Sequence, residues 1–187
     1  MADFMPAYNI TAGNEGGWVH NPSDSGGETI FGIARNSWGG WQGWLIVDDC
    51  KRHLGVIPLF GTQSYHSYAR LLTMACRANA TLMGQVSDFY RQNFWNGFDA
   101  INSQEVANKL YDAGVNMGTG AAAKIMQRCV GAIPDGCIGP HSIQAINSVD
   151  PDDLIAQFKA ARIQYYDDIV KTHPQDAQFL EDWIARC

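Results

Sequence analysis

The chain has 187 residues, of which 46% are hydrophobic and 17% are charged, and its formal net charge at pH 7 is −6. This composition is typical of one ordinary globular domain, and it excludes intrinsic disorder, which needs fewer apolar residues and more net charge. The longest uninterrupted apolar runs, such as residues 44–47, are far shorter than the roughly 20 residues that cross a bilayer. We therefore expect no integral membrane segment.

Charge is unevenly distributed along the sequence. Residues 1–50 hold six acids and one base (net −5), residues 51–131 hold eight bases and four acids (net +4), and residues 132–187 hold nine acids and four bases (net −5). An acidic protein is poorly suited to non-specific nucleic-acid binding, which depends on neutralising phosphates with Lys and Arg. We expect no nucleic-acid partner, although the basic middle third fits either an anionic polymer or dispersed surface charges.

Cysteine and histidine spacing argues against a disulfide framework and against a metal site. The five cysteines are odd in number and follow no repeating spacing, so free thiols are the expectation. Whether Cys129 and Cys137 pair after export is left open. The five histidines do not fall in metal-binding spacing, and we expect no metal and no other cofactor. The amino terminus lacks a basic stretch followed by an apolar one, which predicts synthesis in the cytoplasm without a signal peptide.

The first third of the chain predicts one helix and a small β element. Apolar residues at helical intervals favour a helix over residues 3–14 that ends near Gly13. Two short β-prone runs, residues 18–20 and 29–33, flank a cluster of turn-forming residues and predict a small hairpin or an extended loop. Residues 36–62, rich in Gly and Trp, are expected to be irregular with at most one short helix.

The rest of the chain is predicted to be helical. Helices are expected over residues 65–79 and 82–95, over 102–117 with Asn102 as N-cap and Glu105 reciprocating, and over 119–130 with Thr119 as N-cap. Pro140 favours a helix start. Asp150 is expected to cap a last long helix, whose apolar stripe is expected to contain Leu154, Phe158, Ala161, Tyr165 and Ile169. The predicted fold is mainly α.

Glu15 is the best candidate for acid chemistry. It lies where the first predicted helix ends, so the negative pole of the helix dipole faces it, and Trp18 and Val19 can remove water from it. Both effects disfavour the ionised carboxylate, and a carboxylic acid that is protonated near neutral pH can donate its proton to a glycosidic oxygen. The alternative is a solvated glutamate at a helix end. Gly16 and Gly17 favour the first interpretation because glycines let a ligand approach the backbone closely.

Asp24 and Thr29 are candidates to assist Glu15. A chain excursion that turns back after Glu15 can bring both residues opposite it, since each strand residue advances about 3.3 Å. Asp24 then stabilises a positively charged sugar carbon or holds a water, and Thr29 positions that water with its hydroxyl. For Asp24 the role of a turn former is an equal alternative.

Four segments, in this order, resemble one family. They are Glu-Gly-Gly-Trp-Val at 15–19 with the Asn-Pro-x-Asp-x-Gly-Gly-x-Thr-x-x-Gly-Ile pattern at 21–33, Tyr-Arg-Gln-Asn-Phe-Trp at 90–95, the Asn-x-Gly and Gln-Arg helices at 113–128, and Asp-Gly-Cys-Ile-Gly-Pro at 135–140. Together they are similar to glycoside hydrolase family 108, the N-acetylmuramidases of phage endolysins and secretion-associated lysozymes. His20 departs from the family pattern, and residues 40–81 look like an insertion or a divergent segment.

The resemblance implies a lysozyme-like helical fold, peptidoglycan as substrate and Glu15 as the catalytic acid. It implies one lysozyme-like domain over residues 1–187, with the catalytic motifs in 1–100 and a helical part with a peptidoglycan-binding-like region in 101–187. Asp24 and Thr29 are the expected helpers, and the expected substrate contacts are Trp18, His20, Tyr111 and Asn116. For the aromatic residues a place in the core is the alternative, and for Asn116 it is a helix C-cap.

The function expected from the resemblance is cleavage of the β-1,4 bond between N-acetylmuramic acid and N-acetylglucosamine, with no choice made between inversion and retention. Two rivals stay open: a lytic transglycosylase and a noncatalytic peptidoglycan-binding secretion helper. A phage endolysin released by a holin, or a delivered effector with an immunity protein, fits an enzyme that acts on the cell wall in the periplasm.

Overall fold

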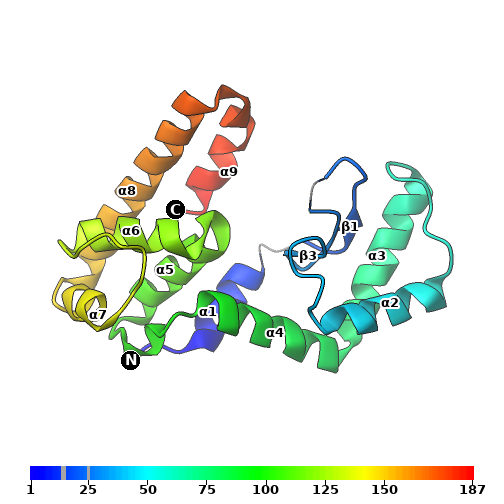
Figure 1. The fold of residues 1–187 in the computed structure, drawn as a ribbon, viewed down its shortest axis with the longest axis horizontal. Helices are drawn as coiled ribbons and strands as arrows, with labels where there is room; N and C mark the ends of the chain where they lie inside the picture. The colour runs from blue at the N-terminus through cyan, green and yellow to red at the C-terminus, as the bar shows by residue number, and fades with distance from the viewer. Residues whose placement is uncertain (14–15, 25) are drawn as a thin grey trace. The chain divides into compact units, whose positions relative to one another are not determined.

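The computed structural model describes residues 1–13, 16–24 and 26–187. Its elements appear in Figure 1. The helices are α1 (Phe4–Ala12), α2 (Gly43–Leu54), α3 (Gln63–Ala78), α4 (Ala80–Phe94), α5 (Gln104–Met117), α6 (Thr119–Cys129), α7 (Pro140–Asn147), α8 (Pro151–Thr172) and α9 (Leu180–Ala185), with 3-10 helices η1 (Phe98–Ala100) and η2 (Pro174–Phe179). The strands are β1 (Val19–His20), β2 (Glu28–Ile30) and β3 (Ile33–Ala34). The mainly α, lysozyme-like fold with a small β element is therefore confirmed.

The chain divides into two compact units, which are described separately below. One unit, here called the helical unit, consists of Met1–Thr11 and Arg91–Cys187. The other, the hairpin unit, consists of Ala12–Tyr90. The hairpin unit holds the sheet with α2 and α3, and the helical unit holds α5 to α9.

The sheet of the hairpin unit is antiparallel, in the order β1-β2-β3. Val19 pairs with Thr29, and Ile30 pairs with Ile33. The two residues between β2 and β3, Phe31 and Gly32, have φ angles of 48° and 78°. Two consecutive residues with positive φ are the requirement of a type I′ turn, whose twist matches that of the strands it joins. The sequence predicted the first hairpin but not the third strand.

Residues 36–62 are more ordered than expected, because they contain the 12-residue helix α2. Its inner face buries Trp44 and Val47, and its last turn carries Lys51 and Arg52, which suit the negative end of the helix dipole. Helix α3 agrees with its prediction. It begins after Thr62, whose side-chain oxygen accepts the backbone N–H of Tyr65.

The helix caps of the helical unit agree in part with those predicted from the sequence. Asp150 is the N-cap of α8, as predicted, and its Oδ1 accepts the backbone N–H groups of the two acidic residues that follow Pro151. The prediction for α5 was wrong by one residue, because Ser103 and not Asn102 is the N-cap. Thr119 is the first residue of α6 and not its cap. That place is taken by Gly118, whose φ of 89° favours glycine.

The apolar stripe predicted for α8 was right in its first half only. Leu154 and Phe158 are buried, but the buried face continues through Arg162 and Tyr166. Successive steps of four residues keep to this face. The remaining predicted members, Ala161, Tyr165 and Ile169, are therefore half-exposed beside the core.

Candidate active site

The structure describes the backbone directly after Glu15, while Glu15 itself and Asn14 lie outside the described residues. The N–H of Trp18 donates to Thr73 Oγ1 at 2.8 Å. A Cβ atom on Gly17 would lie 2.5 Å from that same oxygen. Real Cβ contacts are not this short, so the second glycine of the Glu-Gly-Gly motif lets the chain pass close to α3.

Trp18 is only 3% exposed and belongs to an aromatic cluster of the hairpin unit. Its ring centroid lies 5.7 Å from those of both Tyr65 and Tyr68. Its indole N–H donates to Glu28 Oε1 at 2.6 Å. A ring buried in this way has little face left for a sugar, so the burial favours the core alternative for Trp18.

Glu28 is the residue that sequence reasoning missed in this region. Its carboxylate is buried, yet it accepts from Trp18 and from Lys51 Nζ at 2.8 and 3.0 Å, and Arg35 Nε lies 3.1 Å from its Oε2. The buried carboxylate thus has two cationic side chains and one indole N–H around it. Glu28 therefore links β2 to α2, and both of its carboxylate oxygens are already engaged by neighbouring side chains.

Asp48 extends this network at the surface of α2. It contacts Arg35 Nη2 and Lys51 Nζ, each at 2.8 Å. Burial opposes ionisation of Asp48, but the hydrogen bonds and charges of Lys51 and Arg35 outweigh it and lower the pKa of this carboxyl. The sequence signal for the network was the alternation in β2, which places Glu28 on the same buried face as Ile30.

Asp24 is an exposed residue at the tip of the loop between β1 and β2. Its Oδ1 accepts the N–H of Gly26 at 2.8 Å, and its backbone carbonyl accepts the N–H of Gly27 at 3.0 Å. These bonds make Asp24 a turn former, which was one of its two predicted roles. No hydrogen bond from a described residue reaches its other carboxylate oxygen.

Thr29 and His20 lie on adjacent strands of the sheet. Thr29 is half-buried in the middle of β2, directly opposite Val19. The backbone of His20 is fixed by Tyr65, whose hydroxyl accepts the His20 N–H at 2.7 Å and donates to the His20 carbonyl at 3.2 Å. The His20 side chain is exposed. It is thus held beside the hairpin by its backbone while its imidazole stays accessible.

Tyr111 and Asn116 belong to the helical unit, on α5. Tyr111 is 0% exposed, with Phe4 and Trp95 ring centroids at 5.8 and 5.9 Å, which favours its core alternative. Asn116 is half-buried and donates its side-chain N–H to Tyr166 Oη at 2.7 Å. The C-cap of α5 is Gly118, so the C-cap alternative for Asn116 was wrong.

Nucleophilic and metal chemistry find little support elsewhere in the described part of the chain. Cys76 is fully buried, and burial together with the neighbouring Cys50 raises the pKa of its thiol to about 12. Such a thiol is not a nucleophile near neutral pH. No three His, Cys, Asp or Glu side chains among the described residues gather in a way that could hold a metal ion. None of the described helices is both long and apolar enough to cross a membrane.

Comparison with known proteins adds two family matches and one fold match. A family model described as Glycosyl hydrolase 108 matches residues 8–118, and one described as Predicted Peptidoglycan domain matches residues 121–187. Among solved structures, Brucella abortus SagA is 23% identical, with a TM-score of 0.61 over 98% of this chain and 92% of that chain. At this identity the likeness concerns the fold alone. None of the curated proteins matches the chain.

Proposed function

The chain belongs to the glycosyl hydrolase 108 family, and we propose that it is an N-acetylmuramidase that hydrolyses the β-1,4 bond between N-acetylmuramic acid and N-acetylglucosamine. The two family matches together make it a peptidoglycan hydrolase of the glycoside hydrolase class. The bond and the type of enzyme are our proposal. The match over residues 8–118 carries it, because this segment contains the Glu-Gly-Gly motif, the loop with Asp24 and strand β2.

In the proposed mechanism Glu15 is the general acid that protonates the leaving oxygen. The motif region holds two further carboxylates, Asp24 and Glu28, and the buried ion pairs of Glu28 with Lys51 and Arg35 argue against this role for Glu28. A glycosidase needs an acid whose proton is available near neutral pH. Among the acids of the Glu-Gly-Gly motif and the hairpin that follows, Glu15 and Asp24 are then left for the chemistry.

Water attack on the sugar carbon is assigned to Asp24 or Thr29. Asp24 has one carboxylate oxygen without a described partner at an exposed loop tip, which suits it to contact a water or a positively charged sugar carbon. Thr29 lies in β2 opposite Val19 of β1, and we assign to its hydroxyl the positioning of the attacking water. His20, with its accessible imidazole, and Asn116 are proposed as substrate contacts.

The experiment that tests the proposal replaces Glu15 by Gln and measures lysis of chloroform-treated Gram-negative cells by turbidity. We expect Glu15→Gln to abolish lysis, because the amide cannot donate the required proton, while circular dichroism stays that of the parent chain. The matched control is Glu105→Gln, the same substitution in the first turn of α5, which we expect to lyse normally. Unchanged lysis by Glu15→Gln would indicate a noncatalytic peptidoglycan-binding protein instead.

Mass spectrometry of the digested peptidoglycan distinguishes hydrolysis from transglycosylation. Attack by water leaves reducing ends, whereas attack by the substrate's own hydroxyl leaves 1,6-anhydro ends. We expect reducing ends. Products with anhydro ends alone would identify a lytic transglycosylase and refute the proposed role of Asp24 and Thr29.

A further inference from the structure

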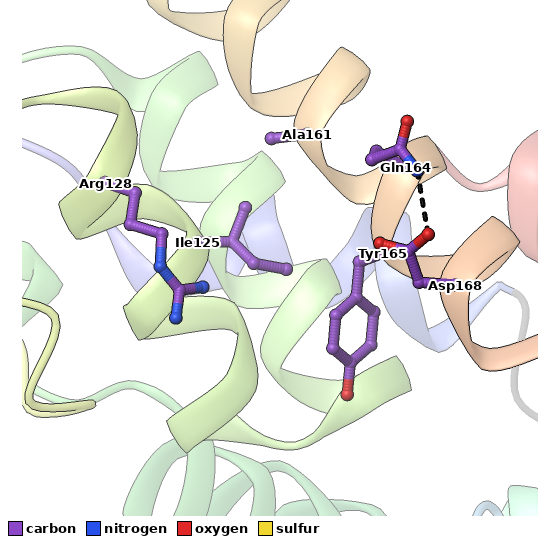
Figure 2. Close-up of a pocket in the computed structure, with 6 residues that line it drawn as sticks. All are labelled: Ile125, Arg128, Ala161, Gln164, Tyr165 and Asp168. Atoms are coloured by element: carbon purple, nitrogen blue, oxygen red, sulfur yellow. Dashed lines mark hydrogen bonds between the residues drawn. The ribbon is translucent and has the colours of Figure 1, made fainter. Parts of the chain in front are cut away.

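A groove of about 230 Å³ lies in the helical unit between α6 and α8, within the segment that matches the peptidoglycan domain. Figure 2 shows its six lining residues. Ile125 and Arg128 come from α6, and the other four come from α8 with the spacing of one helix face: Ala161, Gln164, Tyr165 and Asp168. All of its described lining residues come from these two helices.

The floor of the groove is apolar. Ile125 is buried beneath it, and Ala161 contributes only a methyl group. In Figure 2 Ile125 lies between the guanidinium of Arg128 and the ring of Tyr165. Ala161 and Tyr165 are two of the residues predicted to form the apolar stripe of α8, but they are half-exposed. Apolar surface that the core does not use is available to a ligand.

The charges around the groove favour an anionic ligand. Asp168 already has a cationic partner, because its Oδ1 accepts from Lys171 Nζ at 2.8 Å and from Gln164 Nε2 at 2.9 Å. These hydrogen bonds lower the pKa of the Asp168 carboxyl. Arg128 is exposed and makes no ion pair with any described residue. Arg128 therefore carries the one uncompensated charge among the six lining residues.

We propose that this groove binds the peptide stem of peptidoglycan, with the α-carboxylate of its D-glutamate paired to Arg128 and an alanine methyl on Ile125 and Ala161. The inference rests on the proposed function, which makes peptidoglycan the substrate. Stem peptides combine small methyl side chains with free carboxylates, which are the two features that the groove complements. The planar guanidinium of Arg suits a carboxylate in a two-pronged geometry, and the free carbonyl oxygen of Gln164 can accept a peptide N–H.

The test is isothermal titration calorimetry of the full chain with the tripeptide L-Ala–γ-D-Glu–L-Lys carrying a C-terminal amide. The D-Glu α-carboxylate is the only carboxylate of this probe, and the probe has no glycosidic bond to cleave. We expect Arg128→Ala to weaken binding about tenfold, the typical loss for a charged hydrogen bond. Lys159→Ala, which removes the same charge from an exposed position of α8 outside the groove, should bind like the parent chain.

A second peptide and a second variant make the test specific. In the analogue the D-Glu carboxylate is replaced by a carboxamide. We expect the parent chain to bind this analogue about tenfold more weakly than the tripeptide. The Arg128→Ala variant should bind both peptides equally. Ala161→Leu fills the floor without changing any charge and should abolish binding. The proposal is overturned if the parent chain does not bind the tripeptide, if Arg128→Ala binds it as tightly, or if the two peptides bind the parent chain equally.

The outcome also separates this proposal from the enzymatic one. If the parent chain lyses cells and releases reducing ends but does not bind the tripeptide, the groove assignment fails and the hydrolase stands. If the tripeptide binds through Arg128 but Glu15→Gln lyses cells normally, the groove stands and the catalytic proposal fails.

Discussion

Two buried carboxylates, Glu28 in the hairpin unit and Asp112 in the helical unit, are compensated in different ways. Glu28 has three close partners: the indole N–H of Trp18 at 2.6 Å, Lys51 Nζ at 2.8 Å and Arg35 Nε at 3.1 Å. Its hydrogen bonds come from Trp18 and Lys51, and Arg35 Nε adds a charge contact without a hydrogen bond. A buried ion pair of this kind repays the cost of leaving water only because its geometry is good.

The pairing around Asp112 is looser. Thr11 and Arg186 donate to its Oδ1 at 3.2 and 3.0 Å, but Arg162 Nη2 lies 3.7 Å from its Oδ2. Arg162 is 0% exposed, and none of its three side-chain nitrogens makes a hydrogen bond to a described residue. Glu28 therefore has close cationic partners, whereas the buried Arg162 cation lies 3.7 Å from its anion and also neighbours the Phe158 ring and Tyr166.

The largest effect is expected for Glu28→Ala. This change leaves Lys51 and Arg35 without their buried anion and the Trp18 N–H without an acceptor, and we expect it to lower the free energy of unfolding by about 3–5 kcal/mol. Asp49→Ala removes an acid from α2 that is more than half exposed and pairs with Arg52, and it should cost less than about 1 kcal/mol. Urea denaturation measures both. Equal costs for the two variants would show that the Glu28 network does not stabilise the hairpin unit.

A smaller effect on stability is expected when either partner of the Asp112–Arg162 pair is replaced. Asp112→Ala leaves the buried Arg162 cation without its anion and should lower the free energy of unfolding by about 3 kcal/mol. Arg162→Met keeps most of the side-chain volume and leaves Asp112 with Thr11 and Arg186, so it should cost no more than about 1 kcal/mol. Urea denaturation again gives the values. If Arg162→Met proved as costly as Asp112→Ala, Arg162 would be a strongly stabilising partner of Asp112, and the description of this pair as loose would be wrong.

Helix ends and buried charges show which parts of the fold the sequence could predict. Asp150 as a cap and Pro140 as a helix start were predicted, because each acts on residues next to it in the chain. The choice of Ser103 over Asn102 as a cap was not, since both are good N-caps and only the backbone angles decide. Arg162 was missed because no local pattern places a cation on a buried helix face.

The candidate site was predictable to a similar extent. The hairpin and the exposed loop with Asp24 followed from turn residues and strand alternation. The partners of Glu28 did not, because Lys51 is 23 residues away and reaches β2 only through the packing of α2. The roles of Glu15, Thr29 and Asn116 stay predictions that the experiments on lysis and products address.

The smallest expected effect is on the pH dependence of stability, through two tyrosines that each lie beside one of the two networks. Burial raises the pKa of Tyr68, and the negative charge of Glu28 raises it further. Burial also raises the pKa of Tyr166, but there the Arg162 cation opposes the change. Because both folded pKa values lie above the ordinary value of 10.0, the stability they contribute is present below about pH 10 and is lost as the pH rises further.

Tyr68→Phe tests this pH dependence most cleanly. The Tyr68 hydroxyl is buried and has no hydrogen-bond partner in the described structure, so its removal should change the free energy of unfolding at pH 7 by less than about 1 kcal/mol. Between pH 9 and 11 the variant should lose stability less steeply than the parent chain, because one tyrosine no longer ionises on unfolding. Tyr166→Phe should flatten the profile less and cost more at pH 7, since it deprives Asn116 of its acceptor. Urea midpoints across this pH range measure both, and a steeper alkaline loss for Tyr68→Phe would contradict a raised pKa of Tyr68 in the folded chain.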